Sequence, residues 1–222
     1  MEIRITGSDK LPVRLALASA SHVRITQQTA AFDHMMKLAR AYREQYPDAS
    51  PGDIKDVQMA RRLFRAVSID PTRRRPASEA LLQRAFKRKP LPHVNTAVDV
   101  GNWCALDFLL PTCVYDYDKI RGSIQIRQGE TDESYLALNN REIQVKGKYV
   151  LADSLGPFGS PITDSQRTCV RPLTRTLLFG IWAPDDLDET ILSEKLECFA
   201  HRIQDSCGGD IADSRIFSTS FV

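Results

Sequence analysis

Hydroxyl, carboxylate and guanidinium side chains are concentrated in residues 153–168, which have the sequence DSLGPFGSPITDSQRT. Such groups can hold a polar ligand by hydrogen bonds, although the same residue types also stabilise turns by bonding their own backbone. A 16-residue connection between two strand-like segments is long, and long ordered loops are often functional. The segment therefore favours ligand binding, through Ser160, Asp164, Ser165, Arg167 and Thr168.

A second polar group lies on the apolar segment 94–110, which is expected to be a buried helix of about four turns. Asn95, Asp99 and Asn102 are spaced i, i+4 and i+7, so they share one stripe of that helix. They need partners, because an unsatisfied buried polar group costs about 1–3 kcal/mol. They either cap neighbouring loops or line a cleft, and the sequence alone favours capping.

The segment PTCVYDYDKIRG, which follows this helix, adds Cys113, Tyr115 and Asp116 to the candidate ligand contacts. A cysteine is a nucleophile only where its pKa is lowered, and no histidine lies near Cys113 in the sequence. The five cysteines contain no CxxC pair, which is typical of reduced thiols in a cytoplasmic protein. No metal site, cofactor or catalytic residue is predicted.

Basic residues cluster between Arg61 and Lys89. This range contains ten of them and only two acidic residues, although the net charge of the chain is only +2. Such a cluster is either a phosphate-binding surface or a pair of solvated helix faces, and the sequence leaves both open. The candidate phosphate contacts are Arg73, Arg74, Arg75, Lys87, Arg88 and Lys89.

These groups must be positioned by helices and strands. Hydrophobic periodicity predicts a single α+β domain with a mixed or antiparallel sheet and flanking helices. The domain is expected to comprise a strand and helical part (1–72), a motif-bearing core (73–184) and a C-terminal helix and strand (185–222). Helices are expected at 29–46, 50–67, 75–89, 94–110 and 185–207. Strands are expected at 2–7 and 13–19, in a meander over 123–153, and at 176–183 and 214–221.

No apolar stretch approaches the length of a membrane span, and the N-terminus lacks the pattern of a signal peptide. The sequence therefore predicts a soluble cytoplasmic protein without a membrane partner. Phosphate-loop, dinucleotide, zincin and nucleophile-elbow motifs do not occur in it.

Three motifs resemble a known family: LPHVNTAVDVGNWCAL, LPTCVYDYDKIRGSIQIR and VLADSLGP. They are similar to the B3/B4 domain, the tRNA-binding and editing domain of the phenylalanyl-tRNA synthetase β subunit, and especially to its stand-alone members. The resemblance runs from Arg75 to about Pro184, roughly half of the chain. It implies an α+β module whose cleft, in the synthetase, hydrolyses tyrosyl-tRNA.

This sequence departs from the family at two positions. The resemblance implies that Cys113 replaces the editing histidine and that Phe179 replaces the editing glutamate. Editing of tyrosyl-tRNA therefore does not follow, and aminoacylation is not expected because ATP-binding motifs are absent. The leading hypothesis is an RNA-binding protein for tRNA or aminoacyl-tRNA, acting as a deacylase in trans. The alternatives are a protein that binds a small amino-acid-like ligand and a pure interaction module.

Overall fold

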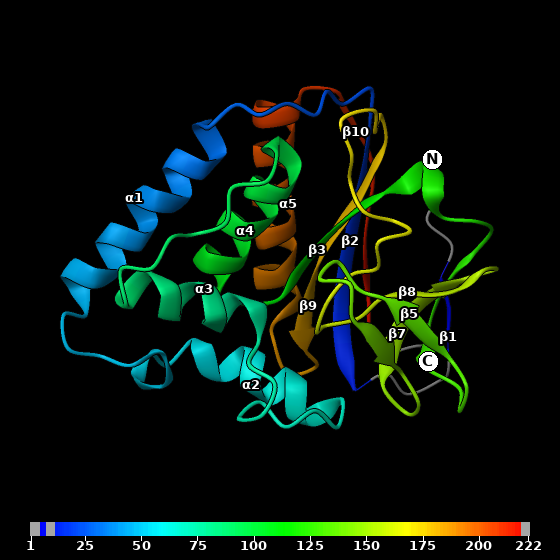
Figure 1. Cartoon of the computed structure of the whole chain (residues 1–222), viewed down its shortest axis with the longest axis horizontal. Helices are drawn as coiled ribbons and strands as arrows, with labels where there is room; N and C mark the ends of the chain where they lie inside the picture. The colour runs from blue at the N-terminus through cyan, green and yellow to red at the C-terminus, as the bar shows by residue number, and fades with distance from the viewer. Residues whose placement is uncertain (1–4, 8–11, 219–222) are drawn as a thin grey trace.

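A computed structural model describes residues 5–7 and 12–218. Figure 1 shows a central sheet with most of the helices on one side and a second, smaller β structure on the other. The central sheet is antiparallel, with the strand order β10-β2-β9-β3. Its members are β10 (Asp210–Phe217), β2 (Val13–Ser21), β9 (Leu177–Pro184) and β3 (Thr112–Asp116).

Strand β9 is buried along its whole length, as its continuous apolar run predicts. Phe179 and Ile181 pack towards the helices, whereas Leu178 and Trp182 pack towards the second sheet. Gly180 allows β2 to approach, because a Cβ at this position would lie 2.2 Å from the carbonyl oxygen of Ala16. The strand thus joins the two main hydrophobic cores.

Two helices, α4 (Thr96–Phe108) and α5 (Glu189–Cys207), pack against one face of the central sheet. Helices α1 (Ala30–Gln45) and α3 (Ala77–Phe86) form a further layer around α4. Helix α2 (Val57–Ala66) lies on the other face, where Leu63 and Phe64 join the second core.

The smaller β structure contains a sheet of order β1-β4-β7-β8 and a separate β5-β6 hairpin. In this sheet β1 pairs with β4 in parallel and the other pairs are antiparallel. Its strands are β1 (Ile5–Gly7), β4 (Ile124–Gln128), β7 (Tyr149–Asp153) and β8 (Gly156–Gly159), and the hairpin consists of β5 (Ser134–Leu136) and β6 (Glu142–Gln144).

The α+β class is confirmed, whereas three local predictions are wrong. The meander expected over 123–153 is interrupted, because β4 pairs with β7 and not with β5, and the strands form two main sheets. The helix expected over 50–67 is divided into a 3₁₀ turn, Pro51–Asp53, and α2. The backbone is extended at Ile54, whose side chain is buried in the core formed by α1, α3 and α4.

The third wrong prediction is the long loop at 153–168. Residues 156–159 form β8, and the chain then reverses at residues 160–163, where Ser160 N–H donates to the carbonyl oxygen of Thr163 at 3.1 Å. Asp164 forms a β-bridge with Gly159. Strand β10 also begins earlier than predicted, at Asp210, and residues 219–221 of the predicted strand lie outside the described part.

Candidate ligand pocket

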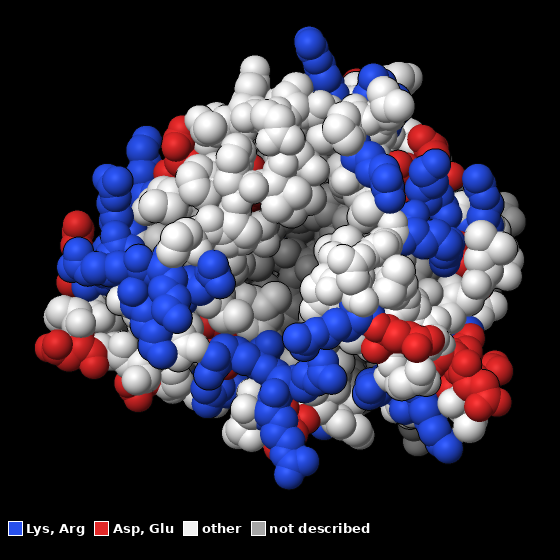
Figure 2. All heavy atoms as spheres, viewed as in Figure 1, with Lys and Arg blue, Asp and Glu red and all other residues white. Residues whose placement is uncertain are grey.

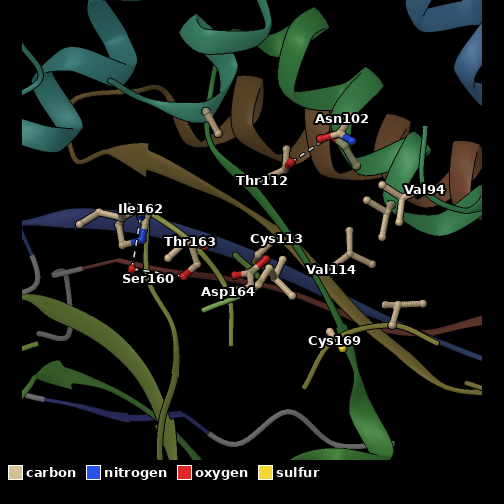
Figure 3. Close-up of a pocket in the computed structure, with 16 residues that line it drawn as sticks. Val94, Asn102, Thr112, Cys113, Val114, Ser160, Ile162, Thr163, Asp164 and Cys169 are labelled. Carbon is tan, nitrogen blue, oxygen red and sulfur yellow. Dashed lines mark hydrogen bonds between the residues drawn. The ribbon is translucent and has the colours of Figure 1, made fainter. Parts of the chain in front are cut away.

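A cavity of about 530 Å³ lies beside the edge strand β3. Helix α4 and the segment before it form one wall, the turn at residues 160–164 forms the opposite wall, and β3 runs between them (Figure 3). Most of the lining is apolar, including Val98, Val114, Ile162 and Val170. A few polar groups among apolar walls are typical of small-ligand sites.

The structure brings four of the predicted ligand contacts into this cavity: Asn102, Cys113, Ser160 and Asp164. They come from α4, β3 and the turn, which are far apart in the sequence. The other six do not line it, and each is held by neighbouring protein groups. These are Asp99, Tyr115, Asp116, Ser165, Arg167 and Thr168.

Asp164 is the only carboxylate among the residues that line the cavity. Its Oδ1 accepts a hydrogen bond of 2.6 Å from the hydroxyl of Tyr115, whereas its Oδ2 has no partner among the described residues. Burial raises the pKa of Asp164 from 3.8 to about 7, and the bond from Tyr115 opposes this shift. At neutral pH Asp164 therefore exchanges between the neutral and the charged form.

Cys113 is buried, and burial together with the neighbouring Asp164 raises the pKa of its thiol well above the ordinary value. The thiol is therefore neutral at physiological pH and is not an activated nucleophile. Phe179, the other departure from the family pattern, packs against Phe199 in the core and does not line the cavity.

The polar stripe on α4 serves both of the purposes considered from the sequence. Asn95 caps the helix by accepting from Val98 N–H at 3.0 Å. Asp99 is fully buried and holds the preceding segment, because it accepts from Val94 N–H at 2.9 Å and lies 2.6 Å from Nδ1 of His93. Asn102 alone faces the cavity, where its side chain has no hydrogen-bond partner among the described residues.

Arg167 has a structural role. Its guanidinium binds both carboxylate oxygens of Asp153 at 2.9 Å and also donates to the carbonyl oxygens of Lys119 and Gly156. The side chain of Asp153 is fully buried. This ion pair joins the two ends of the segment that carries the turn. The geometry therefore gives no support to the prediction that Arg167 contacts a ligand.

The remaining predicted contacts also bond within the protein. Asp116 accepts from the hydroxyl of Thr174 at 2.7 Å and from Asp118 N–H at 3.2 Å. The hydroxyls of Ser165 and Thr168 lie 3.0 Å apart and are buried. Their composition suited ligand binding, but they bond to each other, to a near neighbour and, for Asp116, to Thr174, which is 58 residues away in the sequence.

Several pocket features were missed. Tyr135, from β5, places its hydroxyl 2.9 Å from that of Ser160 and donates to the carbonyl oxygen of Thr163 at 2.7 Å, which fixes the turn. The hydroxyl of Thr112 donates to the carbonyl oxygen of Gly101 at 2.9 Å. Of these residues, only Gly101 could have been singled out from the sequence, because a glycine inside a helical pattern often marks a place where another segment packs closely.

The predicted phosphate contacts are partly assembled around α3. Arg75, Lys87 and Lys89 line a shallow surface cavity of about 230 Å³ together with Arg84. Figure 2 shows Lys and Arg side chains gathered beside and below the hollow of the face, whose walls are mostly uncharged.

Two of the predicted phosphate contacts are partly neutralised by acids. Arg75 shares the buried Glu79 with Arg61, and Arg73 pairs with Asp70 at 3.5 Å. Arg74, Lys87, Arg88 and Lys89 have no ion pair within residues 12–218. These four therefore keep their charge available to an anion.

In the described ranges, no helix is long and apolar enough to cross a membrane. No group of His, Cys, Asp and Glu in those ranges is placed to hold a metal ion.

The fold and the cavity define an α+β domain with a pocket at the edge of its central sheet. Residues 59–195 match the family model of the B3/4 domain, which is more than half of the chain. The chain therefore belongs to the B3/4 domain family, and the resemblance inferred from the three motifs is confirmed.

Curated relatives are phenylalanine–tRNA ligase β subunits. That of Brucella abortus (strain 2308) is 35% identical over 77 residues, covering 34% of this chain and 10% of the relative. That of Bartonella henselae is 29% identical over 118 residues, covering 51% of this chain and 15% of the relative. The matches thus span a small fraction of those proteins.

Among solved structures, an N-terminal fragment of the phenylalanyl-tRNA synthetase β subunit from Pyrococcus horikoshii is similar to this chain. The TM-score is 0.45 at 14% sequence identity, and the match covers 95% of this chain and 52% of that one.

Proposed function

We propose that this protein binds the aminoacylated 3′ end of a tRNA, with the aminoacyl group in the pocket and the phosphates on the basic surface of α3. The observation that carries this proposal is the position of the start of α3 between the two cavities. Ala77 lines the pocket and Arg75 lines the basic cavity. Their Cα atoms are at most about 7 Å apart, because only one residue separates them. One RNA end can therefore reach both.

Membership of the B3/4 family supports the proposal, since the curated relatives are β subunits of a tRNA ligase. The unpaired charges of Lys87, Arg88 and Lys89 supply a sequence-independent attraction for phosphates. The apolar pocket wall provides space for an amino acid side chain.

We further propose hydrolysis of the aminoacyl ester in trans. The ester of an aminoacyl-tRNA is already activated, so the protein has mainly to position it and a water molecule. In this proposal Asp164 acts as the general base, which is supported by its position in the cavity lining and by a pKa of about 7, near the working pH. A thioester with Cys113 is not part of the proposal, since burial keeps that thiol neutral.

The test measures binding and deacylation with the same RNAs. Deacylated and aminoacylated tRNAs are titrated against the protein at low and high salt, and a panel of misacylated tRNAs is assayed for ester hydrolysis. We expect tighter binding of aminoacylated tRNA, steep loss of binding as salt rises, and hydrolysis that Asp164→Asn abolishes. RNA binding that is absent at low salt, or indifferent to salt, would overturn the proposal.

A second candidate is a protein that binds a free amino-acid-like molecule. It is favoured by the mostly uncharged walls of the hollow and by the acids that neutralise Arg73 and Arg75. A thermal-shift screen separates the candidates. Stabilisation by a free amino acid, with none from any tRNA, would decide for this second function.

A further inference from the structure

The hydrogen-bonding direction of β3 follows from the bonds at its two ends. At one end Trp182 N–H donates to the carbonyl oxygen of Pro111 at 2.9 Å, and at the other Tyr117 N–H donates to the carbonyl oxygen of Thr176 at 3.0 Å. These residues are opposite each other in the register of β3 and β9. Because bonded and non-bonded pairs alternate in an antiparallel ladder, the odd-numbered residues of β3 direct their N–H and C=O groups to β9.

The even-numbered residues of β3 must then direct these groups away from the sheet. Asp116 shows this directly, because its N–H donates outwards to the carbonyl oxygen of Thr168 at 2.8 Å. Val114 is half-buried and lines the pocket. Its N–H and C=O have no hydrogen-bond partner in the described part of the chain. One backbone donor and one acceptor therefore lie side by side at the pocket wall.

We propose that this edge of β3 pairs with the main chain of one α-amino acid residue of the ligand. The C=O of Val114 accepts from the ligand's α-amino group, and the N–H of Val114 donates to the ligand's carbonyl oxygen. Two directly opposite residues exchange both bonds in the same way in an antiparallel sheet. The inference rests on the proposed function, because the residue it selects is the acyl group carried by the RNA.

Two other groups in the same cavity fit such an occupant. Oδ2 of Asp164 is an acceptor without a partner among the described residues, and it favours a cationic amine when the carboxyl is ionised. The amide of Asn102, on the opposite wall, offers both a donor and an acceptor (Figure 3). The pocket therefore recognises an α-amino group together with a carbonyl, and its apolar wall receives the side chain.

The free edge is too short for a peptide strand. Asp116 N–H is already bonded to Thr168, and β3 begins only at Thr112. Only Thr112 and Val114 remain with outward backbone groups. Peptides that add a strand to a sheet use a longer row of main-chain bonds. A single residue is the occupant that this length of edge fits.

The test uses the L-amino acid amides as probes and isothermal titration calorimetry as the readout. For the amide that binds best, the α-hydroxy amide and the amide without the amino group are compared with it. We expect both analogues to bind about tenfold more weakly. The amide without the amino group leaves the C=O of Val114 without a donor, and the neutral hydroxyl of the α-hydroxy amide replaces the stronger bond of a cationic amine. Equal binding of all three would overturn the inference.

The protein variant for this test is Val114→Pro, which removes the outward N–H without removing a ladder bond to β9. Proline is tolerated in an edge strand on such a side. We expect about tenfold weaker binding of the amide, whereas the control Val114→Ala, which keeps the N–H, binds within about twofold. Should Val114→Pro fail to fold, the comparison of the three amides in the wild-type protein decides by itself.

Two further outcomes separate this inference from the proposed function. If the amides bind through Val114 but no tRNA binds at low salt, the inference stands and the proposed function fails. If aminoacylated tRNA binds with a steep salt dependence, but removing the amino group does not weaken binding of the amide, the proposed function stands and the inference fails. Tighter binding of tripeptide amides than of amino acid amides would overturn the one-residue occupant.

Discussion

Gly159 and the hydroxyl of Tyr115 occupy adjoining space, because a Cβ on the glycine would lie 2.1 Å from that oxygen. The absence of a side chain at Gly159 lets the phenol reach Asp164 across the start of the turn. The pocket carboxylate is thus positioned by a contact that no other residue type at 159 would allow.

We predict that Gly159→Ala destabilises the protein by about 1–3 kcal/mol, because overpacking displaces the buried ring of Tyr115. Urea denaturation measures the effect. In the Tyr115→Phe background the closest clashing atom is gone, so the added penalty of Gly159→Ala should be smaller than in the wild type. Equal penalties in the two backgrounds would show that the clash is relieved elsewhere.

Arg167→Ala is predicted to lower the free energy of unfolding by about 3 kcal/mol, since it leaves the buried carboxylate of Asp153 unpaired. Arg167→Lys should recover only part of this loss, because an ammonium cannot make the bidentate contact. Chemical denaturation provides the readout. Ligand affinity per folded molecule should remain unchanged, and a loss of affinity without a loss of stability would restore Arg167 as a ligand contact.

The pKa of Asp164 predicts how stability depends on pH. The pKa is about 7 in the folded protein against an ordinary value of 3.8, so the folded state binds more protons between these values. The free energy of unfolding should therefore fall as pH rises from about 4 to about 7, and this contribution should level off above pH 7. Denaturation of wild type and Asp164→Asn at several pH values checks this. The two proteins should differ in slope within that window, and parallel curves would contradict the prediction.

Lys87→Ala and Lys89→Ala are predicted to weaken tRNA binding and to reduce its dependence on salt. Removing one lysine that binds a phosphate should lower the slope of log affinity against log salt by about 1. Lys119→Ala is the matched control, because Lys119 is exposed and lies on the 3₁₀ turn after β3, outside the basic surface of α3. An equal loss of affinity with the control would indicate a general charge effect and not a defined phosphate site.

Periodicity and composition predicted the elements whose burial is uniform. The apolar run of β9 and the amphipathic pattern of α5 were correct because a single physical cause, burial, sets each pattern. Strand β8 was missed because Gly156 and Pro157 have the composition of a turn. Proline is nevertheless compatible with an edge strand, and β8 is the edge of its sheet.

The composition of the polar segment predicted ligand contacts, of which Ser160 and Asp164 line the cavity, but it did not indicate which of its residues would do so. That division depends on partners such as Asp153 and Tyr115, which only the folded chain brings together. The outward groups of Val114 had no sequence signal at all, because they depend on the register of β3 against β9.

The ion pair between Asp153 and Arg167 anchors a segment, some of whose other residues line the cavity. It joins the two ends of the segment outside the cavity, while Ser160 and Asp164 face the cavity from the turn between them. Substitutions at 161–163 can therefore change what the pocket accepts without loosening the framework that holds it. The turn can therefore be exchanged, and the lining of the cavity altered with it, on an unchanged scaffold.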